Sequence, residues 1–461
     1  MSWLLAAILA YLALQVAIGV WIARRIHSES DFLVAGRTLG YPLLVLSVFA
    51  TWFGAESVLA SSARVHREGF ALTEAEPVAY GLCLLLAGLV FAAPLWRRGL
   101  TTLADLFRER YSPAVERAAA LIMIPSSMFW AGAQLRGFAH VLGAVTPLDT
   151  TALVIVAAAV CVAYTMFGGL LADAVTDLVQ GIVIVVGLAT LVAFVVLRRG
   201  GFAATVAAIE PAHVEVFGNR AGLGALGLLE EWAIPVFGSV VAVELVSRMI
   251  AARSPVVARR GTVAAGAIYI TVGLMPVFLG LTAAGMLPAL ADSEQFLPEL
   301  ARLVLPPAAF VLFAGAVISA ILSTVNTILL TSAGLVSHNL AAPLLHITSD
   351  RAKLMLARGG VAVFGVVALV LALTGAGIGA MVEQASAFGS AGVVVVTAFG
   401  LFSGWGGART ALVTLLGALA VYLWGAWSGW PYPFLTSLAA ALLLYGAGAA
   451  GPRVVPALRR S

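Results

Sequence analysis

The sequence contains few charged residues for its length. Only 10% of its 461 residues are Asp, Glu, Lys or Arg, and Lys353 is the only lysine. Soluble domains carry about 25% charged residues and about 45–50% apolar ones, whereas this chain is 62% hydrophobic. So little charge cannot cover the surface of a water-soluble fold of this size. A soluble enzyme, a DNA-binding protein and a disordered scaffold are therefore excluded, and the chain is an integral membrane protein.

Motifs of soluble chemistry are also absent. The two cysteines, Cys83 and Cys161, lie in apolar runs, which is typical of core thiols rather than of a disulfide or a metal site. No phosphate-binding or dinucleotide-binding glycine motif occurs, and no catalytic Ser/His/Asp set is visible. The net charge of +4 comes from arginine-lined loops and does not indicate a nucleic acid. We expect neither an enzyme nor a required protein partner.

Long apolar runs predict an all-α polytopic protein with about thirteen transmembrane helices. A bilayer core of about 30 Å needs roughly 20 apolar residues per helix, and lipid-exposed backbone must satisfy its own hydrogen bonds. The predicted spans start near Trp3, Leu39, Ala75, Glu116, Thr151, Ala174, Gly224, Arg260, Leu303, Leu354, Ala380, Ala411 and Pro433.

The placement of arginine predicts the orientation. With the N-terminus outside, 19 of the 26 basic residues fall in inner loops, among them Arg248. Positive charge prefers the cytoplasmic side, so we expect the C-terminus in the cytoplasm and the protein in the plasma (inner) membrane. The first run has no basic residue before it and Arg24 and Arg25 directly after it, so it predicts a retained span rather than a cleaved signal peptide.

The order of the spans predicts two blocks of five helices with inverted topology. The predicted divisions are a first span and cytoplasmic loop (1–38), a first repeat (39–197), an extracellular linker (198–223), a second repeat (224–403), and two C-terminal spans with a short tail (404–461). The first span of each repeat carries an interruption, Phe49–Gly54 in one and Ile234–Gly238 in the other. Such paired interruptions indicate the midplane site of a transporter, although they can also be simple kinks.

Polar residues inside the spans are candidates for function. Carboxylates near the bilayer centre cost at least about 2.5–3.5 kcal/mol, so they usually face a cavity, a partner or an ion. Glu56 and Arg136 could form a structural pair, or both could line a pocket. The hydroxyls of the stretch Ser319–Thr327 either bond their own helix or offer oxygens to a hard cation.

Three segments resemble the sodium:solute symporter family, which shares the leucine-transporter-type inverted repeat. They are Asp31–Arg37 with the broken span after it, Tyr164–Gln180, and Ser319–Thr327. The resemblance covers nearly the whole chain in order and spacing. It implies a sodium site with backbone carbonyls and side-chain hydroxyls as ligands, and an acidic residue, Asp177, involved in sodium coupling. The implied ligands are the carbonyls of Ala50, Phe53 and Ala320 and the hydroxyls of Ser323 and Thr324.

Within this family the chain resembles sodium/proline symporters overall but differs from them at Trp52, where they carry an aspartate. Trp52, Tyr80 and Trp130 are instead similar to the aromatic pocket positions of choline transporters. Gln134 follows Trp130 by one helical turn and shares its face. Glu56 has the same relation to Trp52, and Glu244 and Glu383 are expected to border the same cavity.

These observations predict a sodium-coupled symporter that imports a small organic solute by alternating access, with sodium as the co-transported ion. Aromatic faces and carboxylates favour a solute with a positive nitrogen, such as choline, a betaine or an amino acid. If Arg136 faces the cavity, it would instead favour a zwitterion or an organic acid. The alternatives are import of a carboxylate or sugar-like solute, or a passive channel.

Overall fold

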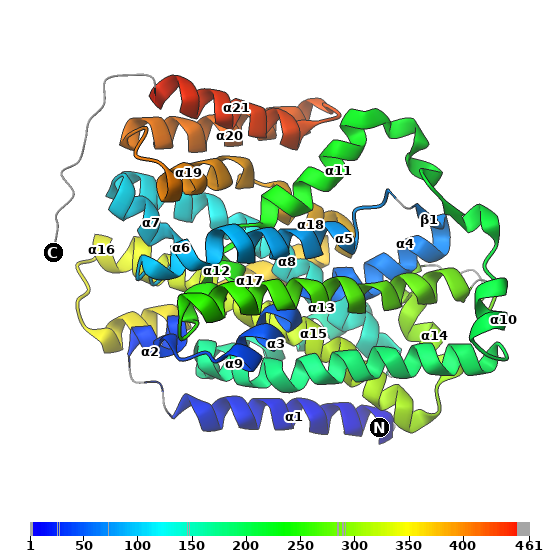
Figure 1. The fold of residues 1–461 in the computed structure, drawn as a ribbon. Coiled ribbons are helices and arrows are strands. Elements are labelled where there is room, and N and C mark those ends of the chain that lie inside the picture. Colours follow the sequence, from blue (N-terminus) through cyan, green and yellow to red (C-terminus); the bar gives the residue numbers. More distant parts are fainter. Residues whose placement is uncertain are drawn as a thin grey trace.

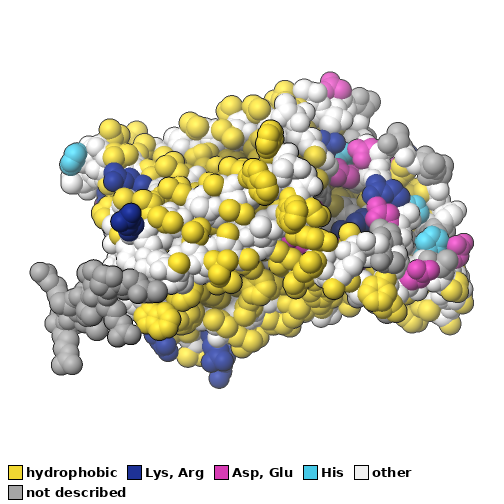
Figure 2. All heavy atoms as spheres, turned by 90° about the horizontal axis from the view of Figure 1, so that it is seen from above, with side chains coloured by type: hydrophobic (Ala, Val, Ile, Leu, Met, Phe, Trp, Pro, Cys, Tyr) yellow, Lys and Arg dark blue, Asp and Glu magenta, His cyan; other side chains and the backbone are white. Residues whose placement is uncertain are grey.

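The computed structural model is almost entirely helical and describes residues 3–449 except 25, 27, 72, 145, 147, 284, 288, 289 and 291. The predicted tail, 450–461, lies outside the described residues. The helices lie side by side, with α1 (Trp3–Ala23) on one flank and α20 (Ala408–Ser428) and α21 (Pro433–Ala449) on the opposite flank (Figure 1). Hydrophobic side chains cover the middle of the face in Figure 2, and charged side chains gather toward its ends.

The described helices can be compared with the thirteen predicted spans, of which seven to ten are long and apolar enough to cross a membrane. Seven are continuous, three are bent pairs, and three are shorter apolar helices, which are α1, the first part of α9 (Thr150–Met166) and α21. The continuous spans are α5 to α6 (Val78–Leu86, a π turn at Ala87–Phe91, then Ala92–Arg97), α8 (Pro113–Gly143), the second part of α9 (Gly168–Arg198), α13 (Pro255–Thr282), α15 (Pro307–Gly334) continued by a π turn (Leu335–Ala341) and α16 (Ala342–Leu344), α17 (Asp350–Thr374) and α20. The bent pairs are α3 (Tyr41–Trp52) with α4 (Ser61–Glu68), α11 (Gly224–Ser239) with α12 (Val243–Ala251), and α18 (Ile378–Ala387) with α19 (Ser390–Phe402).

Short elements occupy the two ends of the bundle. One end holds α2 (Glu29–Val34), a 3-10 turn (Ala35–Arg37) and α7 (Leu103–Arg110). The opposite end, which is the predicted outer end, holds the parallel pair β1 (Phe70–Ala71) and β2 (Val214–Glu215), α10 (Phe202–Ala207), three 3-10 turns (Pro211–His213, Gly218–Leu223 and Ser293–Gln295) and α14 (Phe296–Val304).

The first predicted interruption is confirmed. Helix α3 ends at Trp52 because Phe53 leaves the helical region (φ −92°, ψ 70°), and a π turn at Glu56–Ala60 then leads into α4. The two halves of this span meet at a bend of 61°. A Cβ atom at Gly54 would lie 2.6 Å from the Glu56 carboxylate, so a larger residue at the break would have to displace this side chain.

The second interruption is displaced from its predicted position at Ile234–Gly238. Helix α11 continues past Pro235 to Ser239, and the 42° bend follows at Val240–Ala242. Gly238 allows close packing instead, because a Cβ atom there would lie 2.1 Å from the Ser386 carbonyl oxygen of α18. A further bend of 41°, which the sequence analysis did not predict, separates α18 from α19 at Gly389 (φ +69°).

Helix α15 forms the centre of the bundle. In its most apolar stretch, 78% is buried inside the protein. The corresponding value for the peripheral α17 is 28%. Helix α9 (Thr150–Arg198), which breaks at Gly169 (φ +55°), packs closely along α15. Small residues permit this contact, because a Cβ atom at Gly187 would lie 2.4 Å from the Ala316 Cβ.

This contact can be tested with Gly187→Ala. The added methyl must separate α9 from α15, and overpacking of this kind costs about 1–3 kcal/mol. We expect a lower Tm of the purified protein in detergent. The control is Gly359→Ala on α17, where an added Cβ meets nothing within 4 Å and helix propensity improves. An unchanged Tm for Gly187→Ala would contradict the close packing of these helices.

Candidate functional site

A cavity lies where the broken helices approach one another. It encloses about 600 Å³, part of it open to solvent. Its walls come from α3, α5, α8, the α11–α12 bend and the α18–α19 bend. The lining residues are Trp52, Tyr80, Ile122, Met123, Ser126, Ser127, Trp130, Gly238, Ser239, Val241, Ala242, Val243, Glu244, Val382, Ala385, Ser386, Phe388, Ser390 and Val393.

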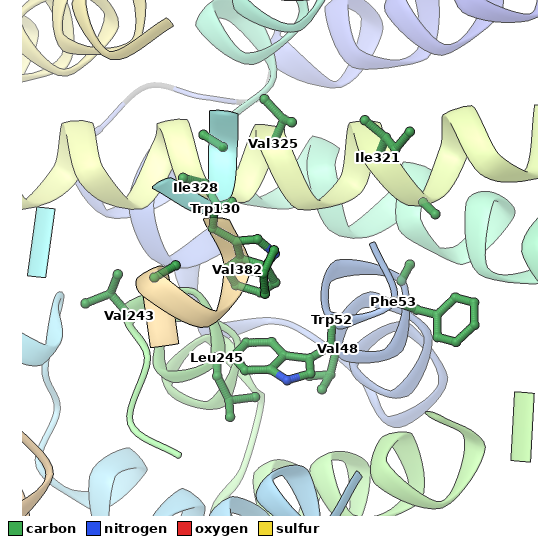
Figure 3. Close-up of a cluster of buried hydrophobic side chains, with 14 of the residues drawn as sticks. Val48, Trp52, Phe53, Trp130, Val243, Leu245, Ile321, Val325, Ile328 and Val382 are labelled. Carbon is green, nitrogen blue, oxygen red and sulfur yellow. The ribbon is translucent and has the colours of Figure 1, made fainter. Parts of the chain in front are cut away.

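Aromatic side chains form one wall of this cavity. The rings of Trp52 and Trp130 pack edge to face, with centroids 5.1 Å apart (Figure 3). The Tyr80 hydroxyl lies 3.1 Å from the Ser386 hydroxyl, which accepts a hydrogen bond of 3.0 Å from Ser239. These contacts hold aromatic groups from three helices around one space.

The polar groups of the cavity are few and include one carboxylate. Glu244 accepts a hydrogen bond of 2.5 Å from Ser127. The indole N–H of Trp52 is buried and has no hydrogen-bond partner among the described residues. The lining residues include no lysine, arginine or histidine. The cavity therefore offers aromatic faces, one negative charge and a free N–H donor.

Of the predicted substrate residues, Trp52, Tyr80, Trp130 and Glu244 line the cavity, whereas Glu56 and Gln134 lie behind the aromatic pair. Gln134 donates from Nε2 to the Glu56 carboxylate (2.6 Å) and accepts from the Ala55 backbone N–H (2.8 Å). The Trp130 indole N–H also donates to Glu56 (3.3 Å). Glu56 and Gln134 thus hold the start of the α3–α4 break against α8.

Arg136 and Glu383 do not reach the cavity. The Arg136 Nε lies 3.5 Å from a carboxylate oxygen of Glu294, and its Nη1 donates to the Gly375 carbonyl (3.4 Å). Its ion pair is therefore with Glu294 and not with Glu56. Glu383 is exposed on α18, because its neighbours Val382 and Ala385 occupy the face that turns inward.

Sequence reasoning missed the serines of the cavity. Ser126, Ser127, Ser239 and Ser386 all line it. The adjacent pair Ser126–Ser127 in an apolar span was the available signal. A single serine in such a span usually bonds its own helix, so Ser239 and Ser386 gave no distinct signal.

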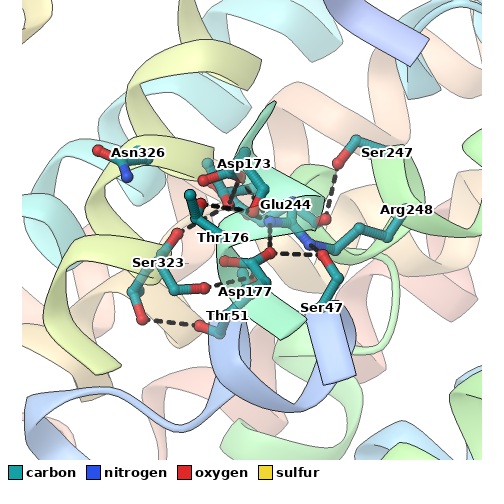
Figure 4. Close-up of polar contacts among 12 residues, drawn as sticks. Ser47, Thr51, Asp173, Thr176, Asp177, Glu244, Ser247, Arg248, Ser323 and Asn326 are labelled. Atoms are coloured by element: carbon teal, nitrogen blue, oxygen red, sulfur yellow. Dashed lines mark hydrogen bonds and ion pairs between the residues drawn. The ribbon is translucent and has the colours of Figure 1, made fainter. Parts of the chain in front are cut away.

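The predicted ion ligands meet at the end of α3. The Thr324 hydroxyl of α15 donates to the carbonyl oxygens of Thr51 (2.8 Å) and Ala320 (3.0 Å). The Ser323 hydroxyl lies 3.3 Å from that of Thr51 (Figure 4). Ala50 and Phe53 lie in the same buried turn. Carbonyl and hydroxyl oxygens without nitrogen or sulfur suit a hard cation.

Beside this group lies a buried charge cluster around Arg248, defined by Arg248, Asp173, Asp177, Ser47 and Thr327. Figure 4 labels its members Arg248, Asp173, Asp177 and Ser47. Nη2 of Arg248 lies 2.6 Å from Asp173 and 2.9 Å from Asp177. Its Nε donates to the Ser47 hydroxyl (2.9 Å), which in turn donates to Asp177 (2.5 Å). Thr327 donates to Asp173 (2.7 Å).

The prediction that Arg248 lies in an inner loop is wrong. Its side chain is fully buried on α12, because Asp173 and Asp177 on α9 provide the negative charge that a buried guanidinium needs. Asp173 was likewise missed, since its partner lies 75 residues away in the sequence. The cluster joins α3, α9, α12 and α15 through charge-assisted hydrogen bonds.

The fold defines the class of this protein. It is similar to a Na+-coupled sialic acid symporter with a TM-score of 0.82, at 17% identity over 97% of this chain and 96% of that one. This is the leucine-transporter-type inverted-repeat fold of secondary transporters. The protein is thus a multi-pass membrane protein with a transporter fold.

Sequence comparisons identify the family. The chain is 24% identical over 387 residues to the high-affinity choline transporter 1 of Drosophila melanogaster, covering 80% of this chain and 62% of that protein. It is 32% identical over 195 residues to the human protein of that name, covering 40% and 33%. It is also 30% identical over 188 residues to human sodium-coupled monocarboxylate transporter 2, covering 40% and 30%. The model of the sodium:solute symporter family matches residues 32–418, so the chain belongs to that family.

The charge cluster can be tested with Arg248→Gln. This change leaves two buried carboxylates without a counter-charge, and breaking a buried pair costs about 3–5 kcal/mol. We expect a large loss of folded protein on size-exclusion chromatography and a lower Tm. Adding Asp173→Asn should restore part of both. Arg302→Gln, whose side chain is 64% exposed beside Glu299, is the control. Normal stability of the single variant would refute the role of the ion pair.

Proposed function

We propose that the protein is a sodium-coupled symporter that imports a small solute with a positive nitrogen, such as choline, a betaine or an amino acid. The observation that carries this proposal is the composition of the cavity. Trp52, Tyr80 and Trp130 surround a space that contains the carboxylate of Glu244 and no basic side chain. This arrangement attracts cations and repels anions.

The physical terms favour a quaternary or protonated nitrogen. A cation over an aromatic face gains about 2 kcal/mol or more when it is desolvated. Glu244 adds a full negative charge in an environment of low dielectric constant, where its attraction is stronger than in water. The unpartnered N–H of Trp52 can donate to an oxygen of the solute, such as a hydroxyl or a carboxylate.

The cavity lining supports this choice of solute over a monocarboxylate. An organic anion is usually bound by an arginine or lysine, but Arg136 pairs with Glu294 away from the cavity and Arg248 pairs with Asp173 and Asp177. Three of the cavity residues, Trp52, Tyr80 and Trp130, resemble aromatic pocket positions of choline transporters. A fourth, Glu244, borders the same cavity. The carboxylate alternative would need a basic residue that the lining does not contain.

The coupling ion in this proposal is sodium, bound by the carbonyls of Ala50, Phe53 and Ala320 and the hydroxyls of Ser323 and Thr324. The site lies at the α3 break, one residue from Trp52 of the cavity. Ser323 also hydrogen-bonds to Asp177, which links the ion ligands to the charge cluster around Arg248 (Figure 4). Sodium binding would thus connect the position of α3 to α15 and α12.

The double variant Ser323→Ala and Thr324→Ala tests the sodium site. It removes two of five proposed oxygen ligands and leaves the backbone intact. We expect choline uptake into proteoliposomes to lose its dependence on an inward sodium gradient, or to disappear. Thr331→Ala is the matched control, since this hydroxyl bonds the Thr327 and Ile328 carbonyls of its own helix. Unchanged sodium activation of the double variant would contradict the proposed sodium site.

Substitutions in the cavity test the solute class. Loss of about 2 kcal/mol in Trp130→Leu should raise the half-saturation concentration for choline about 30-fold. Glu244→Gln should weaken the binding of choline and leave the binding of an uncharged solute unaffected. Glu383→Gln, outside the cavity, should behave as wild type. The measurement is competition by choline, glycine betaine, proline, lactate and glucose in proteoliposomes. Competition by glucose or lactate alone, without competition by the three solutes that carry a positive nitrogen, would reject the positive-nitrogen hypothesis.

A further inference from the structure

A histidine and two carboxylates meet at the predicted outer end of α8, away from the cavity. Nε2 of His140 lies 3.2 Å from an oxygen of Glu294 and 3.8 Å from an oxygen of Asp292. These three ligand atoms all lie within 4.8 Å of one another. His140 belongs to α8. Glu294 lies in the 3-10 turn Ser293–Gln295 between α13 and α15, and Asp292 lies directly before that turn.

One oxygen of each carboxylate accepts a backbone N–H, and the other oxygen lies on the side of His140. Oε1 of Glu294 accepts the Ile378 backbone N–H at the start of α18 (2.5 Å), which leaves Oε2 beside His140. Oδ1 of Asp292 accepts the Glu294 backbone N–H (3.0 Å), which leaves Oδ2 on the same side. A Cβ atom at Gly377 would lie 2.8 Å from Oε1, so glycine is required for this contact. The ligand atoms are thus held by neighbouring groups before any ion arrives.

This set matches the coordination chemistry of Zn²⁺. Zinc binds His nitrogen and carboxylate oxygen at about 2.0–2.2 Å, which places tetrahedral ligand atoms roughly 3.3 Å apart. The present separations of 3.2 and 3.8 Å are close to that value. Three protein ligands leave a fourth position for water. The Asp292 side chain is 36% exposed and gives an ion a route from solvent.

Arg136 opposes a cation at this position. Its Nε lies 3.5 Å from the same Glu294 oxygen that faces His140, and this Nε makes no hydrogen bond to a described residue. A bound metal must therefore displace the guanidinium or bind against its charge. Removal of this charge should strengthen metal binding, whereas a set of residues that merely pair with one another would not respond in this way.

We propose that His140, Asp292 and Glu294 form a binding site for a divalent transition metal, which closes the outer end of the protein when it is occupied. The metal would fasten the segment between α13 and α15 to α8 and, through Glu294, to the start of α18. The site itself does not depend on the transported solute. Its effect on transport rests on the proposed function, because an outer end held shut stops alternating access.

The test uses tag-free, full-length protein in detergent, titrated with ZnCl₂ by isothermal calorimetry. We expect one site, with affinity reduced at least about 100-fold in His140→Ala and in the exposed variant Asp292→Asn. Arg136→Gln should bind about tenfold more tightly or better. His213→Ala, which removes a second histidine–carboxylate pair with Glu210, should bind zinc as wild type does. Equal zinc binding in wild type, His140→Ala and Asp292→Asn would overturn the site.

The closing effect has a readout that needs no transport. Zn²⁺ should slow hydrogen exchange in α14 and at the start of α18 in the wild type but not in Asp292→Asn. Unchanged exchange with zinc bound would overturn the closing role. In proteoliposomes, external Zn²⁺ should inhibit uptake by the wild type and not by Asp292→Asn. If no solute is transported, calorimetry and exchange still decide the metal site, and only the proposed function fails.

Discussion

In the interior of a bilayer, every backbone N–H and C=O group must find a partner, and a helix that breaks there loses several of them. The breaks of this protein therefore lie inside the bundle rather than on its lipid-facing surface. Thr324 donates to the carbonyl of Thr51 at the end of α3, and Gln134 accepts the N–H of Ala55 just beyond it. The proposed ion ligands and the cavity wall follow from this requirement, since the groups that satisfy the break also converge on it.

The charge cluster around Arg248 connects this break with the second one. Arg248 lies on α12, directly after the α11–α12 bend, and contacts Asp173 and Asp177 on α9. Ser47 of α3 and Thr327 of α15 complete the contacts. Because two carboxylates face one guanidinium, the cluster has an excess negative charge beside the hydroxyls of the proposed sodium site. A cation at that site would reduce this excess, which gives a physical reason for coupling between the ion and both broken helices.

The middle of α8 and its C-terminal end carry different polar groups. Toward its middle, Trp130 and Ser127 face a cavity with one carboxylate and no basic group. Further toward the end of the helix, Arg136 and His140 face the acidic residues of the segment between α13 and α15. The single intramembrane arginine predicted to matter for substrate thus belongs to the outer contact. The cavity lining is therefore left without a basic side chain.

The sequence alone determined the membrane class, the helical fold, the family and the break after Trp52, because these depend on composition and on residues close together in the chain. The tertiary structure decided which polar residues meet. Arg248 was expected in a loop, and Arg136 either beside Glu56 or in the pocket, since neither partner, Asp173 or Glu294, lies near in sequence. Pro235 suggested a break that the structure places after Ser239, because Gly238 packs against Ser386 of a distant helix. Contacts such as Asp173–Arg248 and His140–Glu294 join residues 75 and 154 positions apart, and no local pattern encodes them.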